Sequence, residues 1–212
     1  MFKHESLAEL GESVLVERLL TDPSWKSCIT DIDGFPDVAD YFTTVPYDGL
    51  PGAPTGDIDI LVVPDDNPEQ SIAIQAKRVK VGESAFSTGE PNKLKEVQKL
   101  QTQARITADI GFSQTYCYLF VLVDSRANNG GGFKFDGLTT PLQFRIESID
   151  LLAGLDARVG AMRFELVQPL DDRPLGQGTF HARLFRLAQR QVQSPEVTEW
   201  VVKTKRRRLR VA

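Results

Sequence analysis

Two neighbouring apolar segments joined by a polar turn constrain the fold of this 212-residue chain most strongly. The first, Gly56–Val63, ends at Pro64, and the second, Ser71–Val79, begins after the turn Asp65–Pro68. Apolar runs of this length between turn residues predict strands, and the short connection predicts that the two strands pair as a hairpin. Because both runs are strongly apolar apart from a few polar positions, we expect them to be central strands of a sheet.

Polar side chains interrupt both strands at alternate positions. Asp57 and Asp59 share one face of the first strand, and Gln75 and Lys77 share one face of the second. Acids and a lysine on central strands are costly unless they pair or hold a metal ion. Since a hairpin can bring Asp59 close to Gln75 and Lys77, the pattern predicts a carboxylate, an amide oxygen and an ammonium group within one small volume.

The remaining pattern predicts an α/β fold with a mixed central sheet flanked by helices. The expected helices cover Ser6–Leu20, which Asp22-Pro23 ends, and Asn92–Ala108. The expected strands cover the region of residues 40–45, the buried run Gln114–Asp124 and residues 161–167, while residues 184–193 are compatible with a helix. We assign the core to residues 1–125 and a C-terminal elaboration to residues 126–212, both within one compact unit.

Composition excludes several classes of protein. With 41% hydrophobic and 25% charged residues, the chain is typical of a globular protein rather than a disordered or fibrous one. Its cysteines, Cys28 and Cys117, are too scattered for a zinc ribbon or a disulfide scaffold, and its histidines, His4 and His181, disfavour a histidine-dependent triad. No glycine-rich phosphate loop occurs, so we expect no nucleotide cofactor. No apolar run approaches the roughly 20 residues of a membrane span and no secretory pattern begins the chain, so we expect a cytoplasmic protein.

The arrangement of these motifs resembles the PD-(D/E)xK nuclease superfamily. In that superfamily an acidic residue on one strand precedes a [D/E/Q]-x-K motif on the next, after a glutamate-bearing helix and before another helix and strand. Here Asp59 precedes Gln75-Ala76-Lys77-Arg78, and the matching order of elements covers residues 6–124. The Gln-Ala-Lys-Arg form is similar to the Mrr-like restriction endonuclease branch. The resemblance implies a restriction-endonuclease-like core.

The resemblance also implies an activity, that of a Mg²⁺-dependent (or Mn²⁺-dependent) deoxyribonuclease in prokaryotic defence or DNA processing. Asp59 would be the main metal-binding carboxylate, and Gln75 would supply an amide oxygen to the same ion. Lys77 would position the attacking water and stabilise charge in the transition state, and Asp57 would be a second metal ligand. These roles suit Mg²⁺, which takes oxygen ligands, keeps several waters and lowers the pKa of a bound water.

A glutamate on the first helix often assists in this superfamily. Glu12 is the candidate here, with Glu9 and Glu17 as alternatives. The chain departs from the family pattern at two points, because no proline precedes Asp59 and because Gln75 removes a negative charge. The alternative hypothesis is therefore a catalytically inactive nuclease-fold protein that binds nucleic acid or a protein partner. A third is an unrelated α/β interaction domain. For the motif itself, the alternative is that Gln75 and Lys77 are exposed on an edge strand, with an ion pair between Asp59 and Lys77.

Basic residues near the predicted site form two candidate surfaces for DNA. The first lies beside the second strand and on the helix that follows it, and comprises Arg78, Lys80, Lys93, Lys95 and Lys99. The second is the basic tail, residues 203–212, which carries six bases and no acid and includes Arg206, Arg207 and Arg208. Such cations contact phosphates without reading sequence. The alternatives are a solvated helix face and a tail that is disordered or contacts another subunit. Cutting both strands would favour a homodimer, since each phosphodiester needs its own site.

Overall fold

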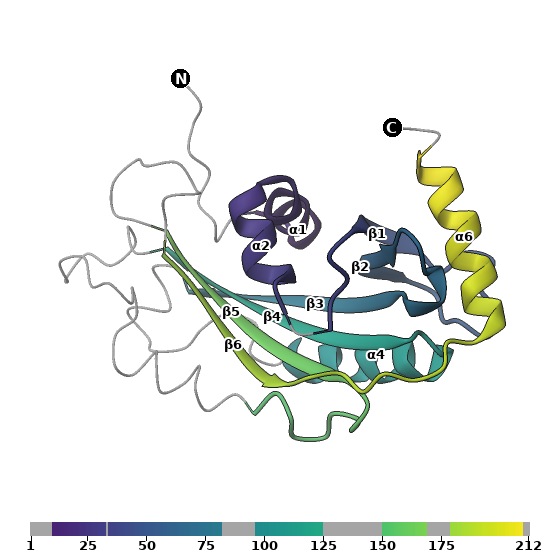
Figure 1. The fold of residues 1–212 in the computed structure, drawn as a ribbon. Helices are drawn as coiled ribbons and strands as arrows, with labels where there is room; N and C mark the ends of the chain where they lie inside the picture. Colours follow the sequence, from purple (N-terminus) through teal and green to yellow (C-terminus); the bar gives the residue numbers. More distant parts are fainter. Residues whose placement is uncertain (1–9, 33, 82–95, 125–149, 169–178, 210–212) are drawn as a thin grey trace, which may run out of the picture.

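Six strands form a mixed sheet in the order β1-β2-β3-β4-β5-β6 (Figure 1). This computed structural model describes residues 10–32, 34–81, 96–124, 150–168 and 179–209. The strands β3, β4 and β5 are parallel, and the other neighbouring pairs are antiparallel. The expected mixed α/β fold is therefore confirmed. The strands are β1 (Ala39–Pro46), β2 (Asp57–Pro64), β3 (Ile72–Val81), β4 (Gln114–Asp124), β5 (Gly160–Gln168) and β6 (Thr179–Arg186).

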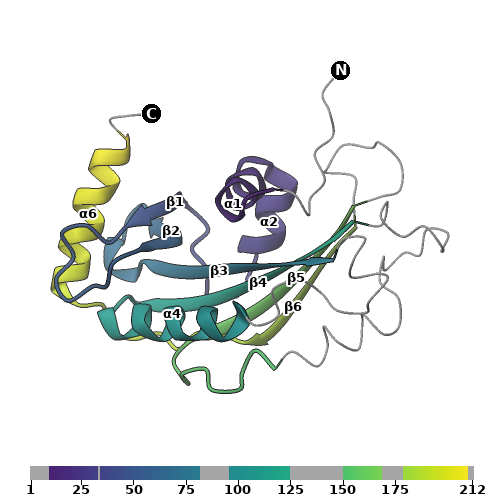
Figure 2. The ribbon, with the colours of Figure 1, turned by 180° about the vertical axis from the view of Figure 1, so that it is seen from behind.

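Helices cover both faces of this sheet (Figures 1 and 2). The helices α1 (Glu12–Thr21) and α2 (Pro23–Thr30) lie over one face, and α4 (Glu96–Ile110) lies against the other. The C-terminal helix α6 (Pro195–Leu209) stands beside β1 and β2, and a short 3-10 helix, η1 (Pro68–Gln70), turns between β2 and β3. Within the described ranges, no helix is long and apolar enough to cross a bilayer.

The central strand β4 shows why the sheet needs cover on both sides. Every residue from Tyr116 to Val123 is fully buried. Tyr118 and Phe120 pack with the α1–α2 layer, whereas Leu119 and Val121 pack with α4. The buried strand expected from this apolar run is confirmed, and its burial is what anchors β3 and β5 on either side.

The N-terminal helices differ from the one helix expected over Ser6–Leu20. Helix α1 begins at Glu12, and residues 6–9 lie outside the described part of the chain. Asp22-Pro23 ends α1 as expected but also begins α2, because Asp22 Oδ1 accepts a hydrogen bond from the backbone N of Trp25 at 3.3 Å. Proline is favoured in a first helical turn, where no backbone donor is needed. The sequence interpretation treated it only as a terminator and therefore missed α2.

The C-terminal region contains the largest differences from expectation. The helix suggested for residues 184–193 is wrong, because these residues form the end of β6 and an extended connection. The pairing of β6 with β5 satisfies its backbone over a long range, which a local pattern does not reveal. Most of the basic tail is helical, since α6 extends through Leu209. Its buried stripe consists of Val197, Trp200, Val201 and Thr204.

Candidate active site

An opening in the ladder between β2 and β3 contains the candidate site. The β2–β3 ladder ends at the pair Ile60–Ile74, although β2 continues to pair with β1 as far as Asp57. Beyond this end, the backbone N of Ala76 donates instead to Asp59 Oδ2, at 2.7 Å. The Asp59 carboxylate thus stands where a strand carbonyl would otherwise accept, and side chains from other elements reach this point.

Four charged side chains, Glu12, Asp57, Asp59 and Lys77, interact here, and we call them the Asp59 cluster. Burial raises the pKa of Asp59 from 3.8 to about 7. The hydrogen bond from Ala76 and the positive charge of Lys77 oppose this rise, whereas the negative charges of Glu12 and Asp57 add to it. The structure therefore brings together residues from α1, β2 and β3 that lie as far as 65 positions apart in the chain.

Glu12 joins the cluster from the helical layer, because it begins α1. Its Oε1 lies 3.1 Å from Lys77 Nζ, and its Oε2 accepts a hydrogen bond from the backbone N of Arg78 at 3.0 Å. The two side chains are only partly exposed, 26% for Glu12 and 19% for Lys77. Of the alternatives, Glu17 is exposed on α1 and Glu9 lies outside the described residues. Glu12 is therefore the helix glutamate that the structure brings to Lys77.

Gln75 lies on the core side of the same opening. Its side chain is 2% exposed, and its Nε2 donates to Tyr47 Oη at 3.0 Å, to the carbonyl of Asp57 at 3.1 Å and to Thr107 Oγ1 at 3.2 Å. These three acceptors share the two hydrogens of the amide nitrogen, and the amide oxygen takes no part in these hydrogen bonds. Gln75 is thus tied to the Asp59 cluster through the carbonyl of Asp57.

Tyr47 and Thr107 are site residues that sequence reasoning missed. Tyr47 follows β1, Thr107 lies on the buried face of α4, and their hydroxyl oxygens are 2.7 Å apart. Burial, aided by the charges of Asp59 and Asp57, raises the pKa of Tyr47 to about 12, so its hydroxyl stays protonated at neutral pH. The sequence did contain one signal for this contact. Thr107 lies on the apolar stripe of its helix, and a buried hydroxyl needs a hydrogen-bond partner.

The oxygen donors near the opening suit Mg²⁺ or Mn²⁺. They are the carboxylates of Asp57 and Asp59, and the Gln75 side chain carries a further oxygen of the kind that these ions bind. Across the described ranges, no group of three or more histidine, cysteine, aspartate or glutamate side chains is arranged to hold a metal ion. Mg²⁺ needs few protein ligands, because it usually keeps several waters.

The cations that we expect to bind DNA differ in how far they are buried and in what they contact. Arg78 is half-buried, its Nε and Nη1 have no hydrogen-bond partner in the described part of the chain, and burial lowers its pKa. Lys80 is half-buried on β3. Lys99 is exposed on α4 and pairs with the glutamate three residues earlier at 2.9 Å. Lys93 and Lys95 lie outside the described residues.

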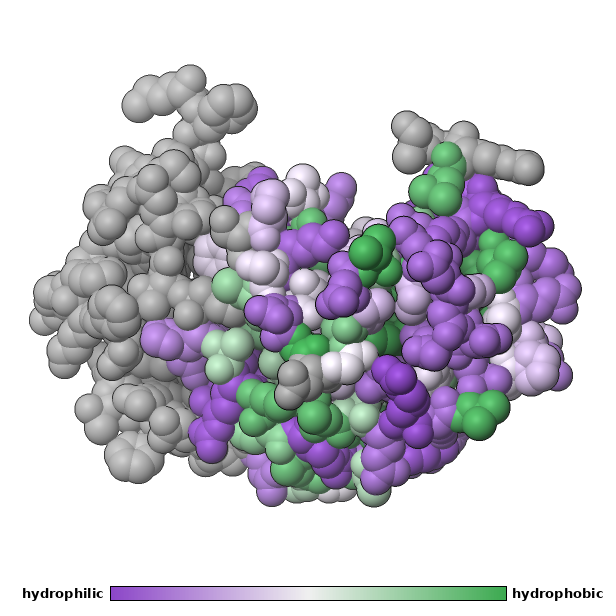
Figure 3. All heavy atoms as spheres, in the orientation of Figure 1, coloured by the Kyte–Doolittle hydropathy of each residue, from purple (hydrophilic) through white to green (hydrophobic). Residues whose placement is uncertain are grey.

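The cations of α6 divide into two groups. Lys205 Nζ binds Asp40 at 2.8 Å and Asp65 at 2.9 Å, and these ion pairs fasten the helix to β1 and to the β2–β3 turn. By contrast, Arg206 and Arg207 are exposed. The surface around α6 is largely hydrophilic (Figure 3). Within the described part of the basic tail, Lys205 is therefore engaged in internal ion pairs, whereas Arg206 and Arg207 face solvent.

Arg208 fastens α6 at a strained residue next to the cluster. Its Nη2 donates to the carbonyl of Thr44 at 2.9 Å. Thr44 has φ 48, in the left-handed region that β-branched residues rarely adopt. The β1–β2 register puts Thr44 across from Asp59. Strained backbone of this kind often occurs at functional sites.

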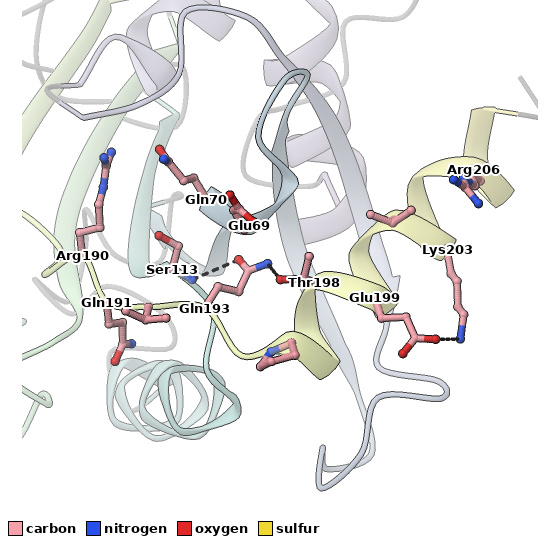
Figure 4. A pocket seen from close by; sticks show the side chains of 13 residues that line it. Glu69, Gln70, Ser113, Arg190, Gln191, Gln193, Thr198, Glu199, Lys203 and Arg206 are labelled. Carbon is pink, nitrogen blue, oxygen red and sulfur yellow. Dashed lines mark hydrogen bonds and ion pairs between the residues drawn. The ribbon is translucent and has the colours of Figure 1, made fainter.

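A separate cavity of about 970 Å³ lies between α6, η1 and the connection that precedes α6 (Figure 4). Gln193 braces its wall, because its Oε1 accepts from the backbone N of Ser71 at 3.1 Å and of Ser113 at 3.3 Å, while its Nε2 donates to Thr198 Oγ1 at 3.0 Å. Arg206 also lines the cavity, but no member of the Asp59 cluster does. The cavity is thus a second surface feature, apart from the candidate active site.

Comparisons with known proteins find only distant structural likeness among the solved structures. No protein-family model and no curated protein matches the chain. Among solved structures, the chain is similar to SPO1766, a protein of unknown function from Silicibacter pomeroyi, at 14% identity and a TM-score of 0.34. The alignment covers 81% of this chain and 77% of that one.

Proposed function

We propose that the protein is a Mg²⁺-dependent deoxyribonuclease that hydrolyses DNA phosphodiester bonds with metal-activated water and no covalent intermediate. The observation that carries the proposal is the partly buried carboxylate of Asp59 at the opened β2–β3 ladder, grouped with Asp57, Glu12 and Lys77. A divalent cation there would offset the repulsion between the carboxylates, which in its absence favours the protonated form of Asp59.

Each member of the cluster has a role in this proposal. Asp59, Asp57 and the amide oxygen of Gln75 would hold the ion, which supplies charge to polarise the phosphate and to lower the pKa of a bound water. Lys77 would position that water and stabilise the negative charge that develops on the phosphate. Glu12, 3.1 Å from Lys77 Nζ, would orient the ammonium group.

DNA would reach this site along the basic residues beside it. Arg78 and Lys80 follow Lys77 along β3, and Arg206 and Arg207 would add a second contact on α6. The proposal includes a role in prokaryotic defence or DNA processing, which the family resemblance suggests, and a cytoplasmic setting, which the sequence pattern suggests. Double-strand cutting would involve a homodimer, so that each strand meets its own site.

Cleavage of plasmid and single-stranded DNA in Mg²⁺, Mn²⁺ or EDTA tests the proposal. The wild type should cut with either ion and not in EDTA. Lys77→Ala should reduce the rate about 100-fold or more, because it removes a group that acts on the water and the phosphate. Lys26→Ala is the matched control. Lys26 belongs to α2, its ammonium group lies over the ring of Tyr41, and it is outside the Asp59 cluster. Cleavage by Lys77→Ala at the wild-type rate would contradict the proposal.

A second candidate function is DNA binding without cleavage. It is favoured by the neutral Gln75 and by the pKa of Asp59, about 7, which leaves part of the population without that carboxylate charge at neutral pH. The same samples distinguish the two functions. DNA that is retarded on a gel in Mg²⁺ but stays intact indicates the binding protein, whereas metal-dependent fragments indicate the nuclease.

A further inference from the structure

The hydroxyl groups around Gln75 form a chain whose direction the hydrogen-bond chemistry determines. Thr107 Oγ1 lies 2.9 Å from the backbone carbonyl of Gln103, which can only accept, so the single hydroxyl hydrogen of Thr107 is donated there. Thr107 Oγ1 must then accept from Tyr47 Oη, 2.7 Å away. Tyr47 Oη has thereby used its own hydrogen and accepts from Gln75 Nε2 at 3.0 Å.

Because of this direction, the groups that Gln75 meets on its core side are all hydrogen-bond acceptors. The carbonyl of Asp57, Tyr47 Oη and Thr107 Oγ1 all accept from Nε2, and since the NH₂ group has two hydrogens, at least one of them is shared between two acceptors. The NH₂ group must therefore point toward these three atoms, and the amide oxygen must point away from them. A carboxylate in the same position would put an oxygen against the carbonyl of Asp57, with no hydrogen between them.

We propose that Tyr47 and Thr107 are positioning residues that orient the Gln75 amide, so that its oxygen serves as a ligand for the divalent cation and a carboxylate at this position is disfavoured. The presence of a metal ion in this inference rests on the proposed function, whereas the orientation of the Gln75 amide rests on the hydrogen-bond chain. It gives a physical reason for glutamine where the family pattern has an acid, because the surrounding atoms select an amide.

Binding of Mn²⁺, measured by isothermal titration calorimetry, tests the metal part of this inference. Tyr47→Phe removes one acceptor and should weaken Mn²⁺ binding about tenfold, as the loss of a residue that orients a metal ligand usually does. Thr107→Val should act in the same direction. Tyr118→Phe is the matched control, because the buried Tyr118 hydroxyl donates to the carbonyl of Ile29 and has no bond to the site. Wild-type affinity in a folded Tyr47→Phe variant would overturn the inference.

Gln75→Glu separates the effect of orientation from the effect of charge. On charge alone, an added carboxylate should tighten Mn²⁺ binding. Because the core side presents acceptors, we expect instead a lower melting temperature in EDTA and no gain in Mn²⁺ affinity at neutral pH. Tighter binding with an unchanged melting temperature would overturn the argument that the pocket selects an amide.

The side-chain NH₂ resonances of Gln75 give a readout that needs no metal. In ¹⁵N-labelled wild type without divalent ions, these hydrogens should exchange slowly with water, and Tyr47→Phe should accelerate the exchange while Tyr118→Phe should not. Slow exchange together with absent Mn²⁺ binding would overturn the proposed function and the ligand role of Gln75, but would support the hydrogen-bond chain. Exchange that is fast in the wild type would overturn the chain itself.

Discussion

At the scale of single residues, Asp59 combines three features that seldom occur together. It is partly buried, it replaces a backbone acceptor for Ala76, and it lies near two other carboxylates. Burial and like charge both oppose ionisation, and only Lys77 and the backbone hydrogen bond favour it. Such a group costs stability when it is forced to carry its charge, and this cost depends on pH.

We predict that wild type without metal loses stability relative to Asp59→Asn as the pH rises from about 4 to about 7. The pKa of Asp59 is raised from 3.8 to about 7, so within this window the folded protein keeps a proton that the unfolded chain has released. The free energy of unfolding of the wild type therefore falls with pH, by at most about 1.4 kcal/mol per pH unit for one group. Thermal denaturation in EDTA at several pH values measures the difference.

Asp66→Asn provides the control for this pH effect. Asp66 is exposed in the turn between β2 and β3, so its variant should follow the pH profile of the wild type. If Asp59→Asn also ran parallel to the wild type from pH 4 to pH 7, the carboxylate of Asp59 would not be shielded from solvent as described above.

At the scale of elements, α6 is held by its cations as well as by its apolar stripe. Trp200 contributes to both kinds of contact, because its ring is buried against Phe112 and its Nε1 donates to the carbonyl of Asp48 at 2.9 Å. Lys205 bridges two acids, Asp40 on β1 of the β1–β2 hairpin and Asp65 in the turn that directly follows this hairpin. A basic helix therefore docks on an acidic hairpin, and the charges that dock it are not the ones that face solvent.

We predict that Lys205→Ala lowers the melting temperature by about 2–4 °C, which corresponds to about 1 kcal/mol in a domain of this size. Lys205 is 22% exposed and pairs with both Asp40 and Asp65, so its loss leaves two carboxylates without their cation. Lys203→Ala should shift the melting temperature by less, because Lys203 is 71% exposed and pairs only along the helix with Glu199. Differential scanning calorimetry of the two variants decides the point, and equal shifts would contradict the docking role of Lys205.

At the scale of the whole molecule, charge is divided between the two parts of the chain. Residues 1–72 carry 15 acids and 3 bases, whereas residues 73–212 carry 14 acids and 22 bases. Part of this division is used internally, where Lys205 meets the acidic hairpin. Other cations of α6 are exposed, among them Arg206 and Arg207, which have no acid partner within the helix comparable to the Lys203–Glu199 pair.

We predict that Arg206→Ala combined with Arg207→Ala weakens binding to duplex DNA at low salt without changing the melting temperature. Each phosphate contact that is lost should reduce the slope of log K against log salt by about 0.9, so two contacts should reduce it by about 2. Cleavage at saturating DNA should persist, because the Asp59 cluster is unchanged. Fluorescence anisotropy over a salt series measures the slope, and an unchanged slope would show that α6 does not contact DNA.

The sequence by itself determined the elements whose signals are local. The central strands β2, β3 and β4 were predicted from their apolar runs. The candidate site residues were predicted because Asp57 and Asp59, and likewise Gln75 and Lys77, are two positions apart and share one face of their strand. These signals depend on chain geometry, because the side chains of a strand alternate whatever the strand packs against. Glu12 could be named only as one of three glutamates, since its contact with Lys77 spans 65 positions.

Only the tertiary structure decided what lies between distant segments. β6 exists as a strand because β5 pairs with it, and α6 is ordered because its apolar stripe and Lys205 find partners near β1 and β2. The direction of the Gln75 amide depends on Tyr47 and Thr107, which come from a loop and a helix far along the chain. Hydrogen bonds and ion pairs of this kind form only between groups about 3 Å apart. A local sequence pattern does not show which distant groups come this close, because that depends on how the chain folds.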